Sequence, residues 1–229
     1  VADGDARWNR WDCDIQMIVH DFNRRFAGYK GYQPLDWRLV KAMLWTESGP
    51  HDPDWNFKPM QAGVGSDPGV TSFLSGNEGG DVIALPDWKG KVTERSARSV
   101  PRHNLYAGIG YLLMRLANFD YKNVPDIDTR VYEVTVKPGD SFDKVAKAQG
   151  STVETMKKLN PSANPHFLKA GQVLKYQKAS MKRVITGWQH VTTSSIATNY
   201  NGGRTPTYAS RLNYAYSAVR KMGMISCAK

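Results

Sequence analysis

The residue with the clearest chemical potential in this sequence is Glu47, which ends an apolar, helix-like segment. Val40, Met43, Leu44 and Glu47 are spaced by three, one and three residues, so they share one face of a helix. A carboxyl group at the end of a stripe that seeks the core is expected to be partly buried, and burial raises its pKa because the charged form is disfavoured. A protonated carboxylic acid near neutral pH is the general acid that cleavage of a glycosidic bond requires. Taken alone, a Glu near a helix end is more often a solvated charge, so this interpretation depends on the rest of the sequence.

Two helices are predicted in the first 50 residues, and the second of them carries Glu47. This helix runs from Trp37 to about Thr46, with Asp36 as a suitable N-cap and Gly49-Pro50 as its end. The first helix is predicted from Asp12 to Phe26, because apolar side chains recur there at helical spacing. These side chains are those of Ile15, Ile18, Val19, Phe22 and Phe26.

Residues 49–101 are rich in Gly, Pro, Asp and Asn and predict an extended loop region with little regular structure. A further helix is predicted from His103 to about Phe119. Gly108 and Gly110 lower its intrinsic propensity, so they are expected to permit close helix packing. Two tryptophans of the loop region are candidates either for stacking on sugar rings or for burial, namely Trp55 and Trp88.

The composition is that of an ordinary globular protein. The 229 residues are 41% hydrophobic and 23% charged, and they leave room for one domain or two. No apolar run approaches the roughly 20 residues that a membrane span needs. The first residues, Val1–Asp5, do not form a signal peptide and lack an initiator Met, so we expect a processed form or a domain cut from a longer chain.

The net charge of +10 is unevenly distributed. Residues 1–129 hold 15 basic and 17 acidic side chains, residues 130–178 hold 9 and 4, and residues 179–229 hold 7 and none. Because Glu154 is the last acidic residue, any catalytic acid must come from the earlier part. Neither a basic recognition helix nor an RNA-binding sequence is present, so nucleic acid is not the expected partner. General attraction to polyanions, an anionic cell wall among them, fits the basic tail.

The two cysteines, Cys13 and Cys227, lie near opposite ends of the sequence. Their spacing excludes a CxxC metal or redox site. If the two ends form one domain, the thiols either meet in a disulfide, which would imply an oxidising compartment, or stay two unrelated buried thiols.

A compact segment with its own beginning and end follows a linker-like stretch, Asn123–Asp128. It opens with an alternating, β-prone run at Val131–Val136. Ser141 can cap a helix to Gln149, and Ser151–Glu154 is a capping-box sequence that opens a second short helix. Gln172–Tyr176 supplies a second strand. The order is β-α-α-β in under 50 residues.

This segment closely resembles the LysM domain, a family that binds glycans containing N-acetylglucosamine, such as peptidoglycan and chitin. The matching pieces are Tyr132–Ser141, Leu159–Pro161 and Leu168–Leu174. The resemblance implies a sugar groove between the loops Gly139–Phe142 and Asn164–Leu168, with Gly139, Asp140, Ser141 and Asn164 as the candidate contacts. A single copy is expected to bind weakly, and the alternative is that it only spaces or braces the rest of the protein.

Outside this segment, four short motifs occur in a fixed order. They are Glu47-Ser48, Pro59-Met60-Gln61, Asn104–Leu112 and Ala197–Gly203. The ordered set resembles the lysozyme-like superfamily, in particular soluble lytic transglycosylases and goose-type lysozymes. Those enzymes show Glu-Ser, Gly-Leu-Met-Gln, an Asn...Gly..Tyr-Leu helix and Ala-Tyr-Asn-Ala-Gly. The resemblance covers residues 10–120 and 185–225, so the LysM-like module is an insertion. The sequence departs from the pattern at Lys58-Pro59, at Thr198-Asn199 and in the longer, Gly-rich stretch 63–101.

The resemblance assigns roles to the matched positions. Glu47 is implied as the catalytic acid, and Tyr200 is implied to hold its carboxyl group by the phenol. Ser48 is implied to stabilise the turn or to contact sugar, and Gln61 is implied to hydrogen-bond the glycan. The full set of positions implied to bind substrate in the cleft is Ser48, Met60, Gln61, Asn199 and Asn201. Without the resemblance, Tyr200 could be a packed aromatic and Gln61 a surface amide.

A second carboxylate bears on whether the sugar is transferred to water, in hydrolysis, or to its own C6 hydroxyl, which gives an anhydro sugar. The resemblance implies that a lytic transglycosylase uses one glutamate as acid and then base, whereas an inverting hydrolase needs another carboxylate roughly 6.5–9.5 Å away to activate water. Asp67, in a loop soon after Gln61, is the first candidate, ahead of Glu78 and Asp81. An Asp before Pro-Gly is also typical of a turn, so the sequence does not decide the mechanism.

The sequence therefore predicts an α+β protein, in which a mainly α, lysozyme-like domain is split around a small βααβ module. The expected boundaries are 1–129 and 179–229 for the first and 130–178 for the second. The resemblance implies a muramidase that cleaves the β-1,4 bond between N-acetylmuramic acid and N-acetylglucosamine in peptidoglycan, without metal or cofactor. The competing hypothesis is a non-catalytic wall-binding protein on the same scaffold. An antibacterial toxin with an immunity protein as partner, a phage endolysin and a wall-remodelling enzyme are all open, and each acts in the cell wall or the periplasm.

Overall fold

The chain folds into two compact units. The computed structural model describes residues 5–62, 68–203, 205–222 and 227. The first unit, here the helical unit, consists of Val1–Phe119 and Ile185–Lys229, and the second, the small unit, is Asp120–Val184. The boundaries expected from the sequence, at 130 and 178, fall inside the small unit.

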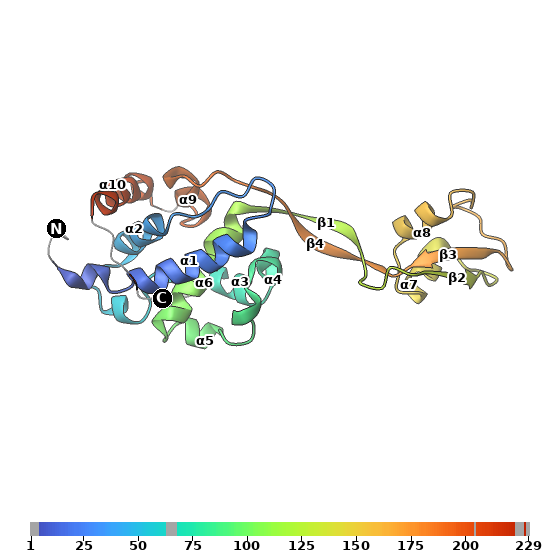
Figure 1. Cartoon of the computed structure of the whole chain (residues 1–229), viewed down its shortest axis with the longest axis horizontal. Coiled ribbons are helices and arrows are strands. Elements are labelled where there is room, and N and C mark those ends of the chain that lie inside the picture. Colours follow the sequence, from blue (N-terminus) through green and yellow to red (C-terminus); the bar gives the residue numbers. More distant parts are fainter. Residues whose placement is uncertain (1–4, 63–67, 204, 223–226, 228–229) are drawn as a thin grey trace. The chain divides into compact units, whose positions relative to one another are not determined.

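The described part of the helical unit is built from α-helices and short 3₁₀ helices (Figure 1). The longer helices are α1 (Asp12–Phe26), α2 (Trp37–Glu47), α6 (Pro101–Leu116) and α10 (Tyr208–Lys221). The short elements are η1 (Ala6–Asn9), η2 (Pro53–Asn56), α3 (Pro68–Leu74), η3 (Asn77–Gly79), α4 (Gly80–Ile83), η4 (Pro86–Trp88), α5 (Glu94–Ala97) and α9 (Thr193–Asn199).

Helix α6 is the centre of the helical unit, and α1, α3, α4, α5 and α9 all contact it. Its two glycines allow close packing, as predicted from the sequence. A Cβ on Gly108 would lie 2.7 Å from the Met60 sulfur, and one on Gly110 would overlap the ring of Phe73. The apolar stripe predicted for α1 is buried in full, so α1 covers another side of the same core.

Helix α2 lies between α1 and α10 (Figure 1). Asp36 is its N-cap, as predicted, and its Oδ1 accepts a hydrogen bond from the Arg38 N–H at 2.9 Å. A buried ion pair joins it to α1, because Lys41 Nζ lies 2.8 Å from Asp12 Oδ2 and both side chains are almost completely buried. Burial raises the pKa of Asp12, and the Lys41 ammonium opposes this shift.

The prediction of an extended loop over residues 49–101 is wrong, because this stretch contains the six short elements from η2 to α5. Helices α3, α4 and α5 have only four to seven residues, and helices of this length are not stable alone. Their packing on α6, rather than the helix propensity of their residues, therefore stabilises them. Trp55 is 2% exposed, and Trp88 stacks on Tyr106 with ring centroids 4.5 Å apart. Burial is therefore the correct alternative for Trp55, whereas Trp88 is only partly buried against the core.

Cys13 and Cys227 form a disulfide with a Cα–Cα distance of 5.5 Å. Of the two alternatives left open by the sequence, the bonded one is therefore observed. The bond closes a loop of sequence separation 214 and ties the chain beyond α10 to α1.

The prediction of a linker at Asn123–Asp128 is wrong for the first residues of this stretch. Strand β1 (Ala117–Pro125) extends through it and pairs with β4 (Ala179–Trp188) in a two-stranded sheet (Figure 1). The unit boundary falls within these two strands. Side-chain hydrogen bonds between the two strands join residues 62 and 68 positions apart, which a local pattern does not reveal.

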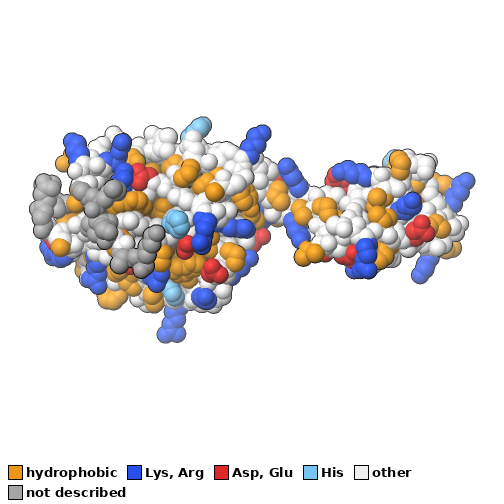
Figure 2. Space-filling model, viewed as in Figure 1, with side chains coloured by type: hydrophobic (Ala, Val, Ile, Leu, Met, Phe, Trp, Pro, Cys, Tyr) orange, Lys and Arg blue, Asp and Glu red, His pale blue; other side chains and the backbone are white. Residues whose placement is uncertain are grey.

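The small unit has the predicted order of elements, β2 (Val131–Thr135), α7 (Phe142–Ala148), α8 (Val153–Leu159) and β3 (Val173–Gln177). Strands β2 and β3 are antiparallel, with Val134 opposite Leu174. The two helices cover the inner face of this sheet around a small core of Val136, Phe142, Val145, Ala146, Met156 and Leu174. Basic side chains are spread over the visible surface of the small unit (Figure 2). Within the described ranges, no helix of the chain is long and apolar enough to cross a membrane.

Candidate functional site

Glu47 is the last residue of α2 and is half-buried. Its Oε1 accepts a hydrogen bond of 2.7 Å from the phenol of Tyr208, the first residue of α10. Tyr208 is 3% exposed, and its burial, together with the adjacent Glu47 carboxylate, raises the pKa of the phenol. Tyr208 therefore stays protonated over the physiological range and acts as a fixed donor to the Glu47 carboxyl group.

The backbone after Glu47 turns sharply and leaves the carboxyl group at the helix end. Ser48 departs from helical geometry at φ −133° and ψ −95°, although its N–H still bonds the Leu44 carbonyl oxygen at 3.0 Å. Gly49 has φ +105°, and a Cβ there would lie 3.2 Å from the Trp8 ring. This turn therefore requires glycine, on grounds of both conformation and space.

The contact between α2 and α10 is reinforced next to Glu47. Arg211, one helical turn after Tyr208, donates from Nη2 to the Thr46 carbonyl oxygen at 3.0 Å. This carbonyl group belongs to the last turn of α2, where orphan acceptors and the negative end of the helix dipole favour a cation. Tyr208 and Arg211 thus bind adjacent positions of the same helix end.

The tyrosine predicted to hold Glu47 was Tyr200, and the structure corrects this assignment. The phenol of Tyr200 donates to the Met60 carbonyl oxygen at 3.2 Å, and its ring packs against Tyr111 with centroids 5.5 Å apart. The phenol that bonds Glu47 belongs to Tyr208, eight positions later. Tyr200 therefore acts on the Met60-Gln61 loop.

The backbone of residues 59–62 is held by side chains from three separate elements. The Ser48 hydroxyl at the end of α2 donates to the Pro59 carbonyl oxygen at 3.0 Å, which is the turn-stabilising one of its two predicted roles. Asn104 of α6 accepts from the Met60 N–H at 3.0 Å, and Tyr200 at the end of α9 donates to the Met60 carbonyl oxygen. Three of the four ordered motifs therefore converge on this loop, which contains the fourth.

Within the loop, Met60 and Gln61 have different environments. Met60 is 1% exposed and packs against Gly108, so the prediction that its side chain contacts substrate is wrong. Gln61 is half-buried and has φ +50°, a left-handed conformation that is uncommon for a residue other than glycine. Its Nε2 is buried and has no hydrogen-bond partner among the described residues.

The amide groups of Asn199 and Asn201 hold backbone in place. Asn199 Nδ2 donates to Gln189 Oε1 at 3.0 Å and to the Ser195 carbonyl oxygen at 2.8 Å. Asn201 Oδ1 accepts from the Thr205 N–H at 3.2 Å and so closes the turn that leads to α10. The substrate contacts expected of both residues stay predictions.

The candidates for a second carboxylate have different outcomes. Asp67 lies outside the described residues. Glu78 has φ +52°, and its Oε2 lies 3.5 Å from Nη1 of Arg115, which in turn donates from Nε to the Asn199 carbonyl oxygen at 3.2 Å. In the described part of the chain, no three His, Cys, Asp or Glu side chains group together as metal ligands.

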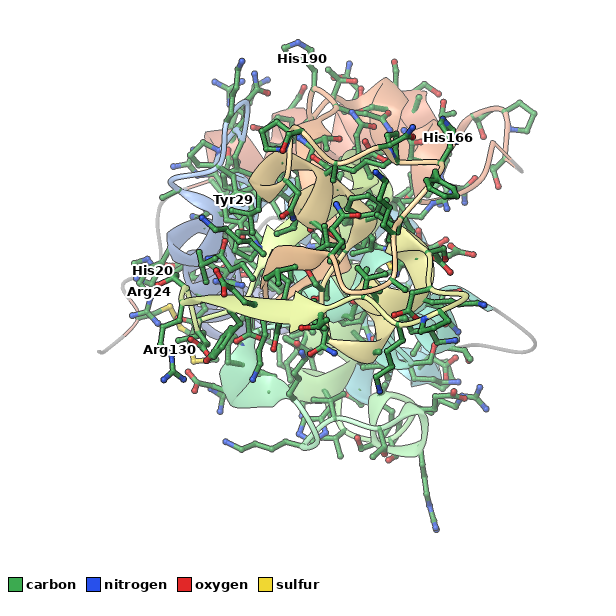
Figure 3. All side chains as sticks on the ribbon, turned by 90° about the vertical axis from the view of Figure 1, so that its right-hand side faces the viewer. His20, Arg24, Tyr29, Arg130, His166 and His190 are labelled. Carbon is green, nitrogen blue, oxygen red and sulfur yellow. A yellow bond between two sulfur atoms is a disulfide. The ribbon has the colours of Figure 1, made fainter. Side chains whose placement is uncertain are left out.

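The loops of the small unit that were predicted to bind sugar are closed by their own side chains. After Gly139, which has φ +81°, Asp140 Oδ2 accepts from the Lys137 N–H at 2.7 Å and Ser141 caps α7 by accepting from the Lys144 N–H. On the loop between α8 and β3, Asn164 Oδ1 accepts from the His166 N–H at 2.9 Å, and His166 is exposed there (Figure 3). These bonds define the loops, and the sugar contacts stay predictions.

Two residues of the Glu47 region were missed by sequence reasoning. Asn104 was part of a recognised motif, and a polar residue on an otherwise apolar helix was the available signal for a buried role. Tyr208 lies beyond the last motif, and the sequence holds no sign that this tyrosine rather than Tyr200 reaches Glu47.

Comparison with known proteins identifies one part of the chain. Residues 134–176 match the LysM domain family. This match falls within the small unit, and the LysM prediction is thereby confirmed. No curated protein and no solved structure matches the chain.

Proposed function

We propose that the protein is a peptidoglycan-cleaving muramidase of the lysozyme-like superfamily, with Glu47 as the general acid and the LysM domain as its wall-binding module. The observation that carries the proposal is the hydrogen bond from Tyr208 to Glu47, which joins the end of α2 to the beginning of α10. The convergence of the other three motifs on the Pro59-Met60-Gln61 motif supports it. The LysM match indicates peptidoglycan binding and therefore supplies the substrate class.

In the proposed reaction, Glu47 gives its proton to the glycosidic oxygen while the bond from this oxygen to C1 of N-acetylmuramic acid breaks. Glu47 then carries a negative charge, and the Tyr208 phenol already donates to its Oε1. A hydrogen bond to an ionised acceptor is stronger than one to a neutral acceptor, so Tyr208 stabilises the charge as it develops. Its raised pKa suits this role, because the phenol keeps its proton.

Two completions of the reaction are consistent with this first step. In a hydrolase, water adds to C1 and gives its proton to a carboxylate, which is either that of Glu47 or a second one. In a lytic transglycosylase, the C6 hydroxyl of the same sugar adds to C1, gives its proton to the Glu47 carboxylate and leaves a 1,6-anhydro end. Mass spectrometry of digested muropeptides separates the two, because reducing ends identify hydrolysis and anhydro ends identify the transglycosylase.

The proposal is tested by a turbidity assay on purified peptidoglycan with the wild type and Glu47→Gln. Lysis by the wild type alone supports the enzyme. Equal lysis by both proteins would rule out Glu47 as the acid.

The second candidate is a wall-binding protein without catalytic activity. It is favoured by the LysM match, which concerns the small unit alone and requires no chemistry in the helical unit. Binding of both proteins to peptidoglycan with lysis by neither would establish it.

The biological setting is also part of the proposal. A LysM domain suggests action outside the cytoplasm, and we propose the periplasm or cell wall as the site. Expression with and without a periplasmic leader tests the toxin hypothesis and its immunity partner, since harmlessness in the periplasm would contradict both.

A further inference from the structure

Asn104, near the beginning of α6, is completely buried and uses every hydrogen-bonding group of its side chain. Its Oδ1 accepts from the Met60 N–H at 3.0 Å. Its Nδ2 donates to the Ala62 carbonyl oxygen at 2.9 Å and to the Ala97 carbonyl oxygen at 2.8 Å. One buried amide thus fixes the backbone on both sides of Gln61 and ties it to the end of α5.

Gln61 is the residue enclosed by this clamp, and it has two unfavourable features. Its backbone is left-handed, and its buried Nε2 has no hydrogen-bond partner in the described part of the chain. Backbone strain and an unpaired buried donor both cost free energy, and both persist only where the surroundings impose them. Here the Asn104 bonds, the Tyr200 bond to Met60 and the bond from the Gln61 N–H to the Lys58 carbonyl oxygen impose them.

We propose that Asn104 is a positioning residue that holds the Gln61 amide as a preformed hydrogen-bond donor for an acceptor oxygen of the glycan. The inference rests on the proposed function, because it needs a glycan bound to the helical unit. A preformed donor loses no conformational entropy on binding, so it adds affinity without a cost of ordering. Asn104 contributes through the geometry of Gln61 and touches no substrate itself.

A double-mutant cycle separates positioning from simple stabilisation. Gln61→Met removes the donor. In Asn104→Ser, the side chain at position 104 is too short to bond both sides of the loop. We expect each single variant to lower kcat/KM about tenfold, the equivalent of one hydrogen bond. We expect the double variant to be no worse than either single variant, because the same donor is lost only once. Losses that multiply would overturn the proposal.

The chain offers a matched control in Asn23, a second clamp in the same unit. Its Oδ1 accepts from the Leu35 N–H at 2.8 Å, and its Nδ2 donates to the Leu35 carbonyl oxygen at 3.0 Å. Asn23→Ser is therefore expected to lower the melting temperature as a structural substitution does, while KM stays unchanged. An equal rise of KM in Asn23→Ser and Asn104→Ser would show that Asn104 is merely structural.

A binding measurement does not depend on catalysis. The measurement is an NMR titration of the Glu47→Gln protein with a tetramer of N-acetylglucosamine. The side-chain amide resonance of Gln61 is identified beforehand, because it is the resonance that Gln61→Met removes. We expect the resonance to shift, and Asn104→Ser but not Asn23→Ser to abolish the shift. If the wild type cleaves no peptidoglycan but the shift occurs, the proposed catalysis fails and the positioning role stands.

The remaining outcomes are equally decisive. Cleavage by the wild type without any shift of the Gln61 resonance overturns the inference alone. Should Asn104→Ser not fold, the Glu47→Gln protein still gives the result, because an unshifted Gln61 amide in a folded chain contradicts its role as donor.

Discussion

The small unit and the helical unit differ in how far along the chain their decisive contacts reach. In the small unit, Asp140 closes a turn with Lys137 and Ser141 caps the helix that follows it, both over three residues. In the helical unit, the hydrogen bond from Tyr208 to Glu47 spans 161 residues, and the one from Tyr200 to Met60 spans 140.

This difference explains why the two units are not equally recognisable. Local contacts leave a pattern in a continuous stretch of sequence, and the stretch 134–176 matches a known family. The site around Glu47 is assembled from the ends of α2, α9 and α10 with the loop 59–62, so no single stretch contains it. Substitutions that change one unit and leave the other intact therefore test its chemistry.

The largest expected effect is that of Glu47→Gln. Loss of a general acid costs roughly 10² to 10⁴ in rate, so we expect lysis of peptidoglycan to fall about 10³-fold. Cosedimentation with insoluble peptidoglycan should be unchanged, because the substitution leaves residues 134–176 intact. A parallel loss of binding would mean that the helical unit, rather than the LysM domain, carries the affinity.

The next effect is that of the disulfide, which joins two residues of the helical unit. Replacing Cys13 and Cys227 together by Ser is expected to lower the free energy of unfolding of this unit by about 3 kcal/mol, because the unfolded chain gains freedom over a long loop. Calorimetry should show a lower transition for the helical unit and an unchanged one for the small unit. Reductant should lower the wild-type transition and leave that of the double variant where it is; a fall in both would contradict the disulfide as the cause.

A smaller effect is expected from Tyr208→Phe, which removes one hydrogen bond to Glu47. Such a bond to an ionised group contributes about 2 kcal/mol, so we expect the rate of cleavage to fall about 30-fold. Tyr214→Phe is the matched control, since Tyr214 is on the same helix and is 74% exposed. A loss for Tyr208→Phe no larger than that for Tyr214→Phe would contradict the role assigned to Tyr208.

The sequence predicts the features that depend on contacts between residues near each other in the chain, and it misses those that depend on contacts between distant residues. Helix α1 has the predicted bounds, and the small unit has the predicted order of strands and helices, because periodicity and caps are local. The partner of Glu47 was missed because the hydrogen bond from Tyr208 joins residues 161 positions apart, which no local pattern records. The strand pair β1–β4 and the short helices on α6 were missed because tertiary packing, which a local pattern does not record, forms them.

The smallest effect concerns alkaline pH and the tyrosines of the helical unit. Burial raises the pKa of Tyr106 from its usual value of 10.0 to about 12, and Tyr106 is 1% exposed. The unfolded chain then releases this proton at lower pH than the folded chain, so the stabilisation is complete below pH 10 and is lost as the pH rises through 12. At pH 11 the expected loss is about 1 kcal/mol.

Tyr32 is raised in the same way, to about 12, and adds to the effect. The buried core of the small unit contains no tyrosine in its described residues. Denaturant unfolding between pH 9 and about 11.5 should therefore weaken the helical unit first. In Tyr106→Phe the stability at pH 9 falls, but its slope against pH becomes shallower, because one titrating group is gone. If the slope were unchanged while the small unit unfolded first, the difference in buried tyrosines would not be what separates the two units at high pH.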